Sequence, residues 1–209
     1  QKKKEALEEG NTGLDGMAAI LGSGVGLAAI LGDGTVFTDN KRLLELGHNL
    51  VKGLDGQWNL YDEQGGKHKL QNGEKSIELL YGGPFMAKRF LADPNNKDFI
   101  ESYVTFPDGI ESIENALKVL EDVEHPARSQ LIDNILIGIS RETYQKKLIA
   151  QDFVTNSGHD IGRAFAVLIK NYLDQKWVEN IILVSGVGEL FGKPQDGTVE
   201  DLFLKSIRE

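Results

Sequence analysis

A glycine-rich segment, Leu21–Gly26 (LGSGVG), is the first place where residue type and spacing could do chemistry. Glycines have no Cβ, so several main-chain N–H groups can converge on an anion, and a serine hydroxyl adds a donor. The segment lacks the spacing of a dinucleotide fingerprint and the Gly-Lys-Ser/Thr ending of a P-loop. Either it holds phosphates or it is a glycine kink between two strands. The candidate phosphate-binding residues are Gly22, Ser23, Gly24 and Gly26.

A second glycine-rich segment, Val184–Glu189 (VSGVGE), follows an apolar run near the end of the chain. In open α/β sheets, ligands bind outside the carboxyl ends of strands. Glycine at such a place lets a flat ring or a phosphate approach the main chain. A plain strand-to-helix turn is the alternative. The candidate binding residues are Gly186, Val187 and Gly188.

A third candidate is the pair Glu45 and His48, which lies in a polar region (ELGH). A carboxylate close to an imidazole can hold vicinal hydroxyls, because one accepts strongly and the other donates or accepts. The alternative is a surface histidine in a polar loop. The four histidines, at positions 48, 68, 125 and 159, are too scattered to form a metal-spaced pair.

The elements that must position these residues follow from hydrophobic periodicity. Short apolar runs predict strands, and glycine or proline predicts their ends. The predicted strands and turns are Met17–Leu21, Leu27–Leu31, a hairpin turn at Asp33-Gly34, short strands and loops over Asn40–Gly73, and a buried strand at Val178–Val184.

Helical spacing of apolar residues begins at Ser76 and dominates the second half of the chain. A polar connector is expected at Asp93–Asp108, and Asp133-Asn134, inside a helix, is not assigned as a base. The predicted helices are Ser76–Tyr81, a second after the Gly82-Gly83-Pro84 break, Gly109–Leu120, Ala127–Ala150, and one after a break at Ser157-Gly158. Strands first and helices later predict an α/β fold, a mixed sheet with packed helices.

The order of these segments resembles the C-terminal part of ROK-family sugar kinases, within the actin-like/hexokinase ATPase superfamily. Family members show LGTGVGGG, GEIGH, a cysteine-rich zinc loop ending in CLE, SGP, and a late strand running into GGGV. This chain reads LGSGVG, LELGH, a Gly83-Pro84 break and VSGVGE, over roughly residues 10–90 and 155–192. By this resemblance Glu45 and His48 hold sugar hydroxyls, and Glu78, five residues before Gly83, matches the glutamate of CLE.

The resemblance implies an actin-like ATPase (ribonuclease H-like) lobe and ATP-dependent phosphorylation of a hexose or N-acetylhexosamine, with Mg²⁺ accompanying ATP. Residues 1–209 would form the C-terminal lobe of a two-lobed, glucokinase-like enzyme, which the family suggests is a homodimer. The family's DxGGT loop and catalytic Asn-Asp pair do not occur in this chain. We therefore assign no catalytic residue, and we expect the chain alone to turn over negligibly.

Composition excludes several other classes of site and partner. The chain has no cysteine, so the region of the zinc loop, Gly65–Gly73, is not expected to hold structural zinc. A net charge of −9 makes nucleic acid an unlikely partner. The longest uncharged stretch, Met17–Gly32, is shorter than the roughly 20 residues of a membrane helix, so we expect a cytoplasmic protein without a membrane partner.

Two functions of other classes stay open at this point. The first is the sugar-sensing domain of a ROK-type transcriptional repressor, which binds sugar without phosphorylating it. The second is a structural or interaction domain whose glycine turns are purely architectural.

Overall fold

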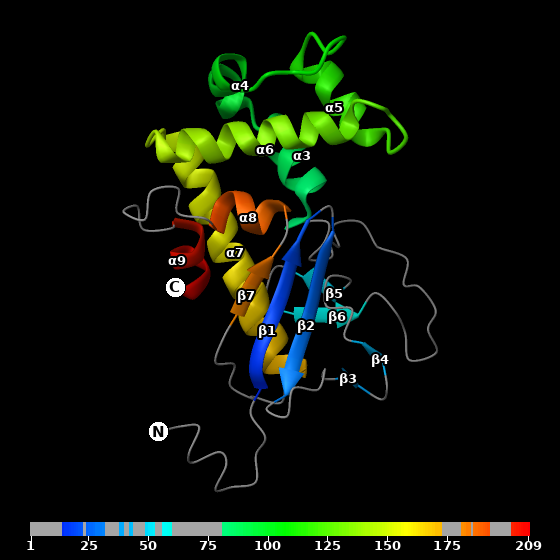
Figure 1. The fold of residues 1–209 in the computed structure, drawn as a ribbon, viewed down its shortest axis with the longest axis vertical. Helices are drawn as coiled ribbons and strands as arrows, with labels where there is room; N and C mark the ends of the chain where they lie inside the picture. The colour runs from blue at the N-terminus through cyan, green and yellow to red at the C-terminus, as the bar shows by residue number, and fades with distance from the viewer. Residues whose placement is uncertain are drawn as a thin grey trace, which may run out of the picture.

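The computed structural model describes residues 14–22, 24–31, 38–39, 42–43, 49–52, 56–59, 81–172, 181–184, 186–192 and 202–209. These residues form an α/β fold in which a strand layer lies beneath a group of crossed helices (Figure 1). The predicted turn at Asp33-Gly34 and the predicted helix before Tyr81 lie outside the described residues.

The central sheet is mixed, as the sequence predicts. Strand β1 (Leu14–Leu21) lies between β2 (Val25–Leu31) and β7 (Ile181–Val184). β1 pairs with β2 in antiparallel orientation, as a hairpin, and with β7 in parallel orientation. A parallel pair needs a long crossover connection, and the helices supply it. Two predicted strands are thus confirmed with longer bounds, and the third begins at Ile181 within the described residues.

Two short antiparallel ladders contain three strands within the predicted region Asn40–Gly73 and one just before it. One joins β3 (Thr38–Asp39) to β4 (Arg42–Leu43). The other joins β5 (Asn49–Lys52) to β6 (Gly56–Asn59). Figure 1 places both ladders beside the β2 edge of the central sheet.

Helix α3 (Gly83–Ala92) begins at the predicted Gly-Pro break, but the prediction of a polar connector after it is wrong. The 3-10 helix η2 (Pro94–Asn96) and helix α4 (Lys97–Tyr103) occupy that stretch. The Asp93 side chain starts η2 by accepting a hydrogen bond from the Asn95 N–H at 2.9 Å. The Phe99 ring then packs edge-on against Phe90 of α3, with centroids 5.3 Å apart. Burial of an aromatic ring therefore outweighs the polar composition of the segment.

Helix α5 (Ile113–Glu121) starts later than the predicted Gly109. The Ser112 hydroxyl accepts a hydrogen bond from the Asn115 N–H at 3.2 Å, which is an ordinary N-cap. Ile110 is buried although it lies before the helix. The prediction made the helix about one turn too long because Ile110 has the spacing of a helical apolar residue.

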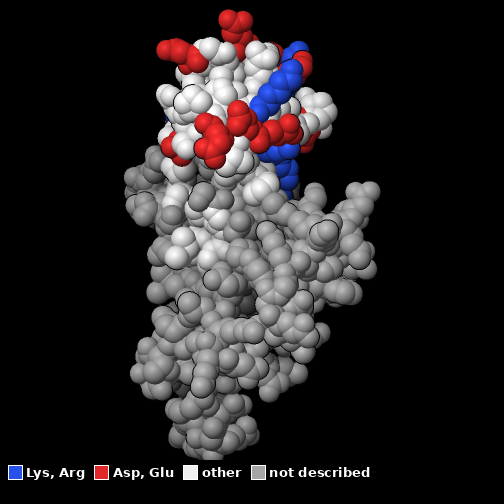
Figure 2. Space-filling model, turned by 90° about the vertical axis from the view of Figure 1, so that its right-hand side faces the viewer, with Lys and Arg blue, Asp and Glu red and all other residues white. Residues whose placement is uncertain are grey.

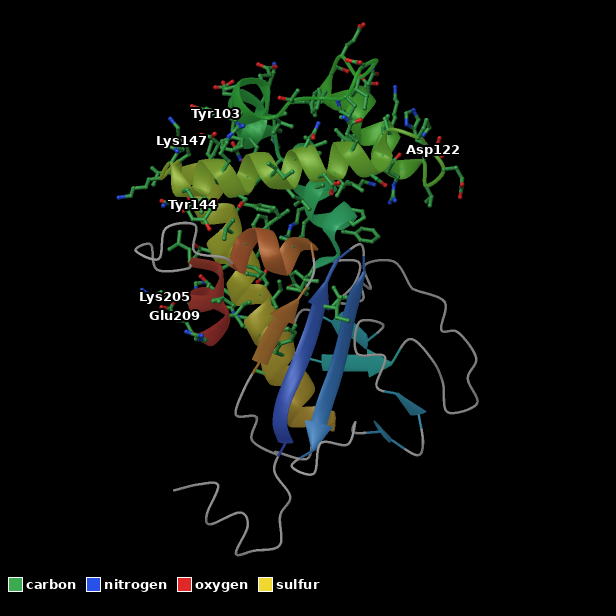
Figure 3. All side chains as sticks on the ribbon, viewed as in Figure 1. Tyr103, Asp122, Tyr144, Lys147, Lys205 and Glu209 are labelled. Atoms are coloured by element: carbon green, nitrogen blue, oxygen red, sulfur yellow. The ribbon has the colours of Figure 1, made fainter. Side chains whose placement is uncertain are left out.

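The predicted helix over Ala127–Ala150 is two helices, α6 (Arg128–Tyr144) and α7 (Leu148–Tyr172). Lys146 has a φ of 59°, and the Lys147 N–H turns back to the Glu142 carbonyl at 3.0 Å. Such a left-handed residue with a backward hydrogen bond is a common helix end. The Lys147 ammonium then lies 5.3 Å from the centre of the Tyr103 ring, at the end of α6 seen in Figure 3.

The predicted break at Ser157-Gly158 is also wrong, because α7 continues through it. The buried Ser157 hydroxyl accepts a hydrogen bond from Arg89 Nη2 at 2.9 Å. A Cβ built on Gly158 would lie 2.8 Å from the Phe203 carbonyl oxygen of α9 (Leu202–Arg208). Both residues are used for packing against other helices and not for ending this one.

Helices α3 to α6 and α8 (Gly186–Gly192) form a cap over one end of the sheet, whereas α7 runs behind the sheet (Figure 1). In Figure 1, α6 lies across this end, with α4 and α5 beyond it and α8 beneath it. The Ser140 hydroxyl of α6 donates to the Leu190 carbonyl of α8 at 2.7 Å. None of the described helices is both long and apolar enough to cross a membrane.

The outer part of this cap is strongly acidic. Residues 93–133 contain ten Asp or Glu and three Lys or Arg. Figure 2 shows acidic side chains gathered over this part of the molecule, with few basic ones among them. This part of the cap therefore disfavours the binding of anions.

The close approach of α7 and α9 gives a first prediction. Alanine normally stabilises a helix interior by about 1 kcal/mol relative to glycine. A Cβ on Gly162 would instead clash with the main chain of Ile207. We expect Gly162→Ala to lower the free energy of unfolding by about 2 kcal/mol, measured by urea denaturation.

Two variants control this experiment. A Cβ on Gly138 would lie 3.1 Å from the Tyr103 carbonyl oxygen, so Gly138→Ala should cost less. Ser129→Ala changes an exposed helical residue and should have little effect. A more stable Gly162→Ala protein would contradict the packing of α9 on α7.

Candidate functional site

The two glycine-rich segments lie at the same edge of the central sheet. Ile20 pairs with Val184 in the parallel ladder, so β1 and β7 end side by side. The turn at residues 22–24 follows β1, and α8 follows β7. This is the edge at which open α/β sheets bind ligands.

The turn between β1 and β2 uses part of its own hydrogen-bonding capacity. The Gly22 N–H donates to the Gly24 carbonyl at 3.0 Å. Gly26 lies within β2, opposite Ile20, and not in the turn. Ser23 is outside the described residues. The Gly22 N–H is therefore engaged inside the turn in this structure, and Gly26 contributes to the strand.

Gly83, at the start of α3, is the residue that holds this turn. Its N–H donates to the Gly22 carbonyl at 2.7 Å. A Cβ on Gly83 would lie 3.1 Å from that oxygen and 3.5 Å from both Leu136 Cδ1 of α6 and Val187 Cγ2 of α8. The position is enclosed on three sides, and it accepts a larger residue only if a neighbour moves.

The other N–H groups in the first turn of α3 are also accounted for. Pro84 has none, and those of Phe85 and Met86 both donate to the Gly82 carbonyl at 3.0 Å. The first turn of a helix usually has unpaired N–H groups that can bind an anion. Here they are paired, so the start of α3 supports the turn and does not itself provide an anion site.

Residues Gly186–Gly188 form the first turn of α8. A Cβ on Gly186 would meet the Leu21 carbonyl at 3.6 Å and Gly22 Cα at 3.7 Å, which are ordinary contact distances. The Val187 side chain is buried, whereas Gly186 is exposed. Three glycine segments that are distant in the sequence thus converge, at Gly22, Gly83 and Gly186.

The structure does not place the three predicted sugar ligands. Glu45, His48 and Glu78 lie outside the described residues, as does the stretch from Gly65 to Gly73. The described residue nearest to Glu78 in the chain is Tyr81.

Tyr81 lies in a buried polar cluster that the sequence analysis did not identify. The Arg89 guanidinium lies 5.9 Å from the centre of the Tyr81 ring and 5.3 Å from that of Phe153, and it donates to Ser157. Burial, reinforced by the negative charge of Asp160, raises the pKa of the Tyr81 hydroxyl far above its usual range. These surroundings favour the neutral phenol of Tyr81.

No group of three or more metal-ligating side chains forms a metal site among the described residues. The described surroundings of the turn are apolar: Leu21, Val25, Leu136 and Val187 are all buried. In this part of the site the chemistry is that of main-chain groups on an apolar base.

The role of Gly83 could not be read from the sequence. Gly82-Gly83-Pro84 signals a helix start, and α3 does begin there. Nothing in its spacing shows that the first N–H of this helix reaches the carbonyl of Gly22. The available signal is the second glycine before Pro84, because a single glycine would be enough to break the helix.

Comparison with known proteins rests on structure alone. No protein-family model matches the sequence, and no curated protein matches it significantly. Solved structures do match its fold. One is a protein from Cytophaga hutchinsonii described as a putative sugar kinase, with 15% identity and a TM-score of 0.50 over 92% of this chain and 45% of that one.

Another is a ROK family glucokinase from Streptomyces griseus, solved in complex with glucose and AMPPNP. It has 21% identity and a TM-score of 0.50 over 95% of this chain and 50% of that one. The helical residues 93–151, which have no counterpart in the sequence resemblance, fall within a match of this extent. The chain thus has a fold similar to that of sugar kinases and spans about half the length of these structures.

Proposed function

We propose that this chain is the C-terminal, actin-like lobe of an ATP-dependent hexose kinase and carries part of the site between two lobes. The observation that carries the proposal is the convergence of Gly22, Gly83 and Gly186 at one sheet edge. The similarity of fold to sugar kinases supports it. No comparison favours the alternative of a sugar-sensing repressor domain.

On this proposal the main chain of the β1–β2 turn contacts the phosphates of ATP. Because the Gly22 N–H is already paired, the donors would come from Ser23 and Gly24. The exposed Gly186, with Gly188, would admit the adenosine without obstruction by a side chain, and the buried Val187 would support them from below. Phosphoryl transfer depends mostly on such positioning and on charge stabilisation.

The proposed sugar ligands are Glu45, His48 and Glu78, whose oxygen and nitrogen atoms would orient a hexose or N-acetylhexosamine. The base that removes the proton of the reacting hydroxyl is not assigned to this chain. Mg²⁺, when bound with ATP, supplies positive charge to the phosphates. The described residues offer no cluster of ligands for it, so it would be held mainly by the nucleotide.

The complete reaction is proposed for a longer protein, since this chain spans about half of the sugar kinases that it matches. The 209-residue chain alone would bind its ligands with negligible turnover. Normal glucose phosphorylation by the chain alone would contradict the proposed division of roles.

Calorimetry distinguishes the proposed function from the alternatives. We expect binding heat from both a non-hydrolysable ATP analogue and a sugar, tested with glucose and N-acetylmannosamine. Heat from the sugar alone would favour a sugar sensor, and no heat from any of them would favour a structural domain.

Substitution of one carboxylate tests the proposed sugar site. Glu45→Gln keeps the size of the side chain but removes the charge that accepts hydrogen bonds from hydroxyls most strongly. We expect loss of sugar binding and unchanged affinity for the ATP analogue. Retained sugar affinity would show that Glu45 is not a ligand.

A second substitution tests the role of Gly83. Gly83→Val pushes a branched side chain against the Gly22 carbonyl, Leu136 and Val187, so the turn must shift. We expect affinity for the ATP analogue to fall about tenfold, which corresponds to about 1.4 kcal/mol.

Gly26→Ala is the matched control for this experiment. A Cβ on Gly26 would meet its nearest atom, Ile20 Cβ, at an ordinary 3.6 Å. We expect nucleotide affinity to change less than twofold, because Gly26 lies in β2 and not in the turn. The opposite order of effects would mean that Gly26, and not the position of the turn, determines binding.

A further inference from the structure

A second candidate binding site lies away from the sheet edge, between α7 and α9. A half-open pocket of about 310 Å³ lies beside the contact between these helices and is lined by residues of both. This volume is at the lower end of the range for small-molecule sites. The lining residues are His159, Gly162, Arg163, Ala166, Ile207, Arg208 and Glu209.

The floor of the pocket consists of small residues. Gly162 lets the main chain of α9 approach α7 so closely that a Cβ there would meet Ile207. Ala166 lies one helical turn further along the same face of α7. The space above these residues is therefore a consequence of helix packing, and longer charged side chains surround it.

Two of the charged side chains that line the pocket are the exposed guanidinium groups of Arg163 and Arg208. No hydrogen bond or ion pair joins either of them to another described residue, although Arg163, like Asp160, acts electrostatically on Tyr81. The carboxylate of Glu209, which Figure 3 labels at the end of α9, is 3.2 Å from His159 Nε2. Asp160 does not line the pocket. Two guanidinium groups therefore line the pocket together with one acidic side chain.

We propose that this pocket binds the phosphoryl group of a small molecule. A guanidinium group presents a planar fork of N–H donors that matches phosphate oxygens in pairs. Arg163 of α7 and Arg208 of α9 both line the pocket and would hold the anion together. Ile207 and Ala166 supply apolar surface for the remainder of the molecule.

The location of the positive charge supports this assignment. The protein has a net charge of −9, and the outer part of its cap disfavours anions. Against this background an anion is attracted where basic side chains outnumber acidic ones, as Arg163 and Arg208 do beside Glu209. The proposal does not depend on the proposed kinase function, because it concerns a different surface.

Titration of the intact chain with inorganic phosphate at low ionic strength tests the proposal, with chloride as the reference salt. We expect saturable binding on the order of 1 mM, and a loss of affinity of about tenfold in each of Arg163→Gln and Arg208→Gln. Ala166→Leu should also weaken binding, because it fills the pocket while both charges remain. This residue is exposed, so the variant should fold normally.

Two further variants localise the effect. Lys97→Gln removes one positive charge from the cap, where Lys97 makes only an exposed pair with Glu101 at 3.8 Å, and should bind phosphate as the unmodified chain does. Gly83→Val disturbs the β1–β2 turn and should also retain phosphate binding. Loss in Gly83→Val but not in the arginine variants would place the anion at the turn and overturn the proposal.

The source of the phosphoryl group can be determined in the same experiment. A hexose 6-phosphate that binds more tightly than inorganic phosphate would identify a sugar phosphate, through contact with Ile207 and Ala166. Equal affinities would identify phosphate itself as the ligand. No saturable binding of either compound, or binding that survives in the double arginine variant, would show that the site does not exist.

Discussion

The hydrogen bond from the Gly83 N–H to the Gly22 carbonyl, 2.7 Å long, is the contact on which the rest of this structure depends. It joins the hairpin of the sheet to the first helix of the cap at a point where no side chain fits without movement. Leu136 of α6 and Val187 of α8 enclose the same point, so both of those helices are positioned relative to the hairpin as well. The Ser140–Leu190 hydrogen bond then fixes α6 to α8. This backbone contact, at which a Cβ on Gly83 would be tightly placed, therefore joins the cap to the sheet.

The predictions that succeeded depend on local chemistry. Apolar runs interrupted by glycine gave the β1–β2 hairpin, and Pro84 after two glycines gave the start of α3. The predictions that failed depend on contacts between distant residues. Ser157 and Gly158 are typical helix-ending residues, yet here Arg89 satisfies the serine hydroxyl and α9 fills the space beside the glycine. The prediction missed the helix end at Lys146 for a similar reason. That end is stabilised by the contact of Lys147 with Tyr103, which lies about forty residues earlier in the chain.

The candidate site shows the same difference. The residue types could be read from the sequence, but the hydrogen bonds that their atoms make could not. Glycine content singled out two segments as candidate binding sites, and the structure shows that they lie at one edge of the sheet. Their hydrogen-bonding pattern could not be predicted, because the Gly22 N–H is used within the turn and the Gly22 carbonyl is used by α3. Gly26 has the same residue type as Gly22 but lies in a strand, where its lack of a side chain has no steric consequence. Linear spacing cannot separate a glycine that is required by close contact from one that is merely tolerated.

The described surroundings of the turn limit the chemistry that it can offer to a ligand. The described side chains nearest to it are Leu21, Val25, Leu136 and Val187, all of them buried and apolar. The guanidinium of Arg89, further along α3, is directed to Ser157. An apolar environment strengthens a main-chain hydrogen bond to a phosphate oxygen, but it also makes an uncompensated phosphate charge costly. On the proposed function, the charge of a phosphate bound at this turn would therefore have to be compensated by groups other than these apolar side chains.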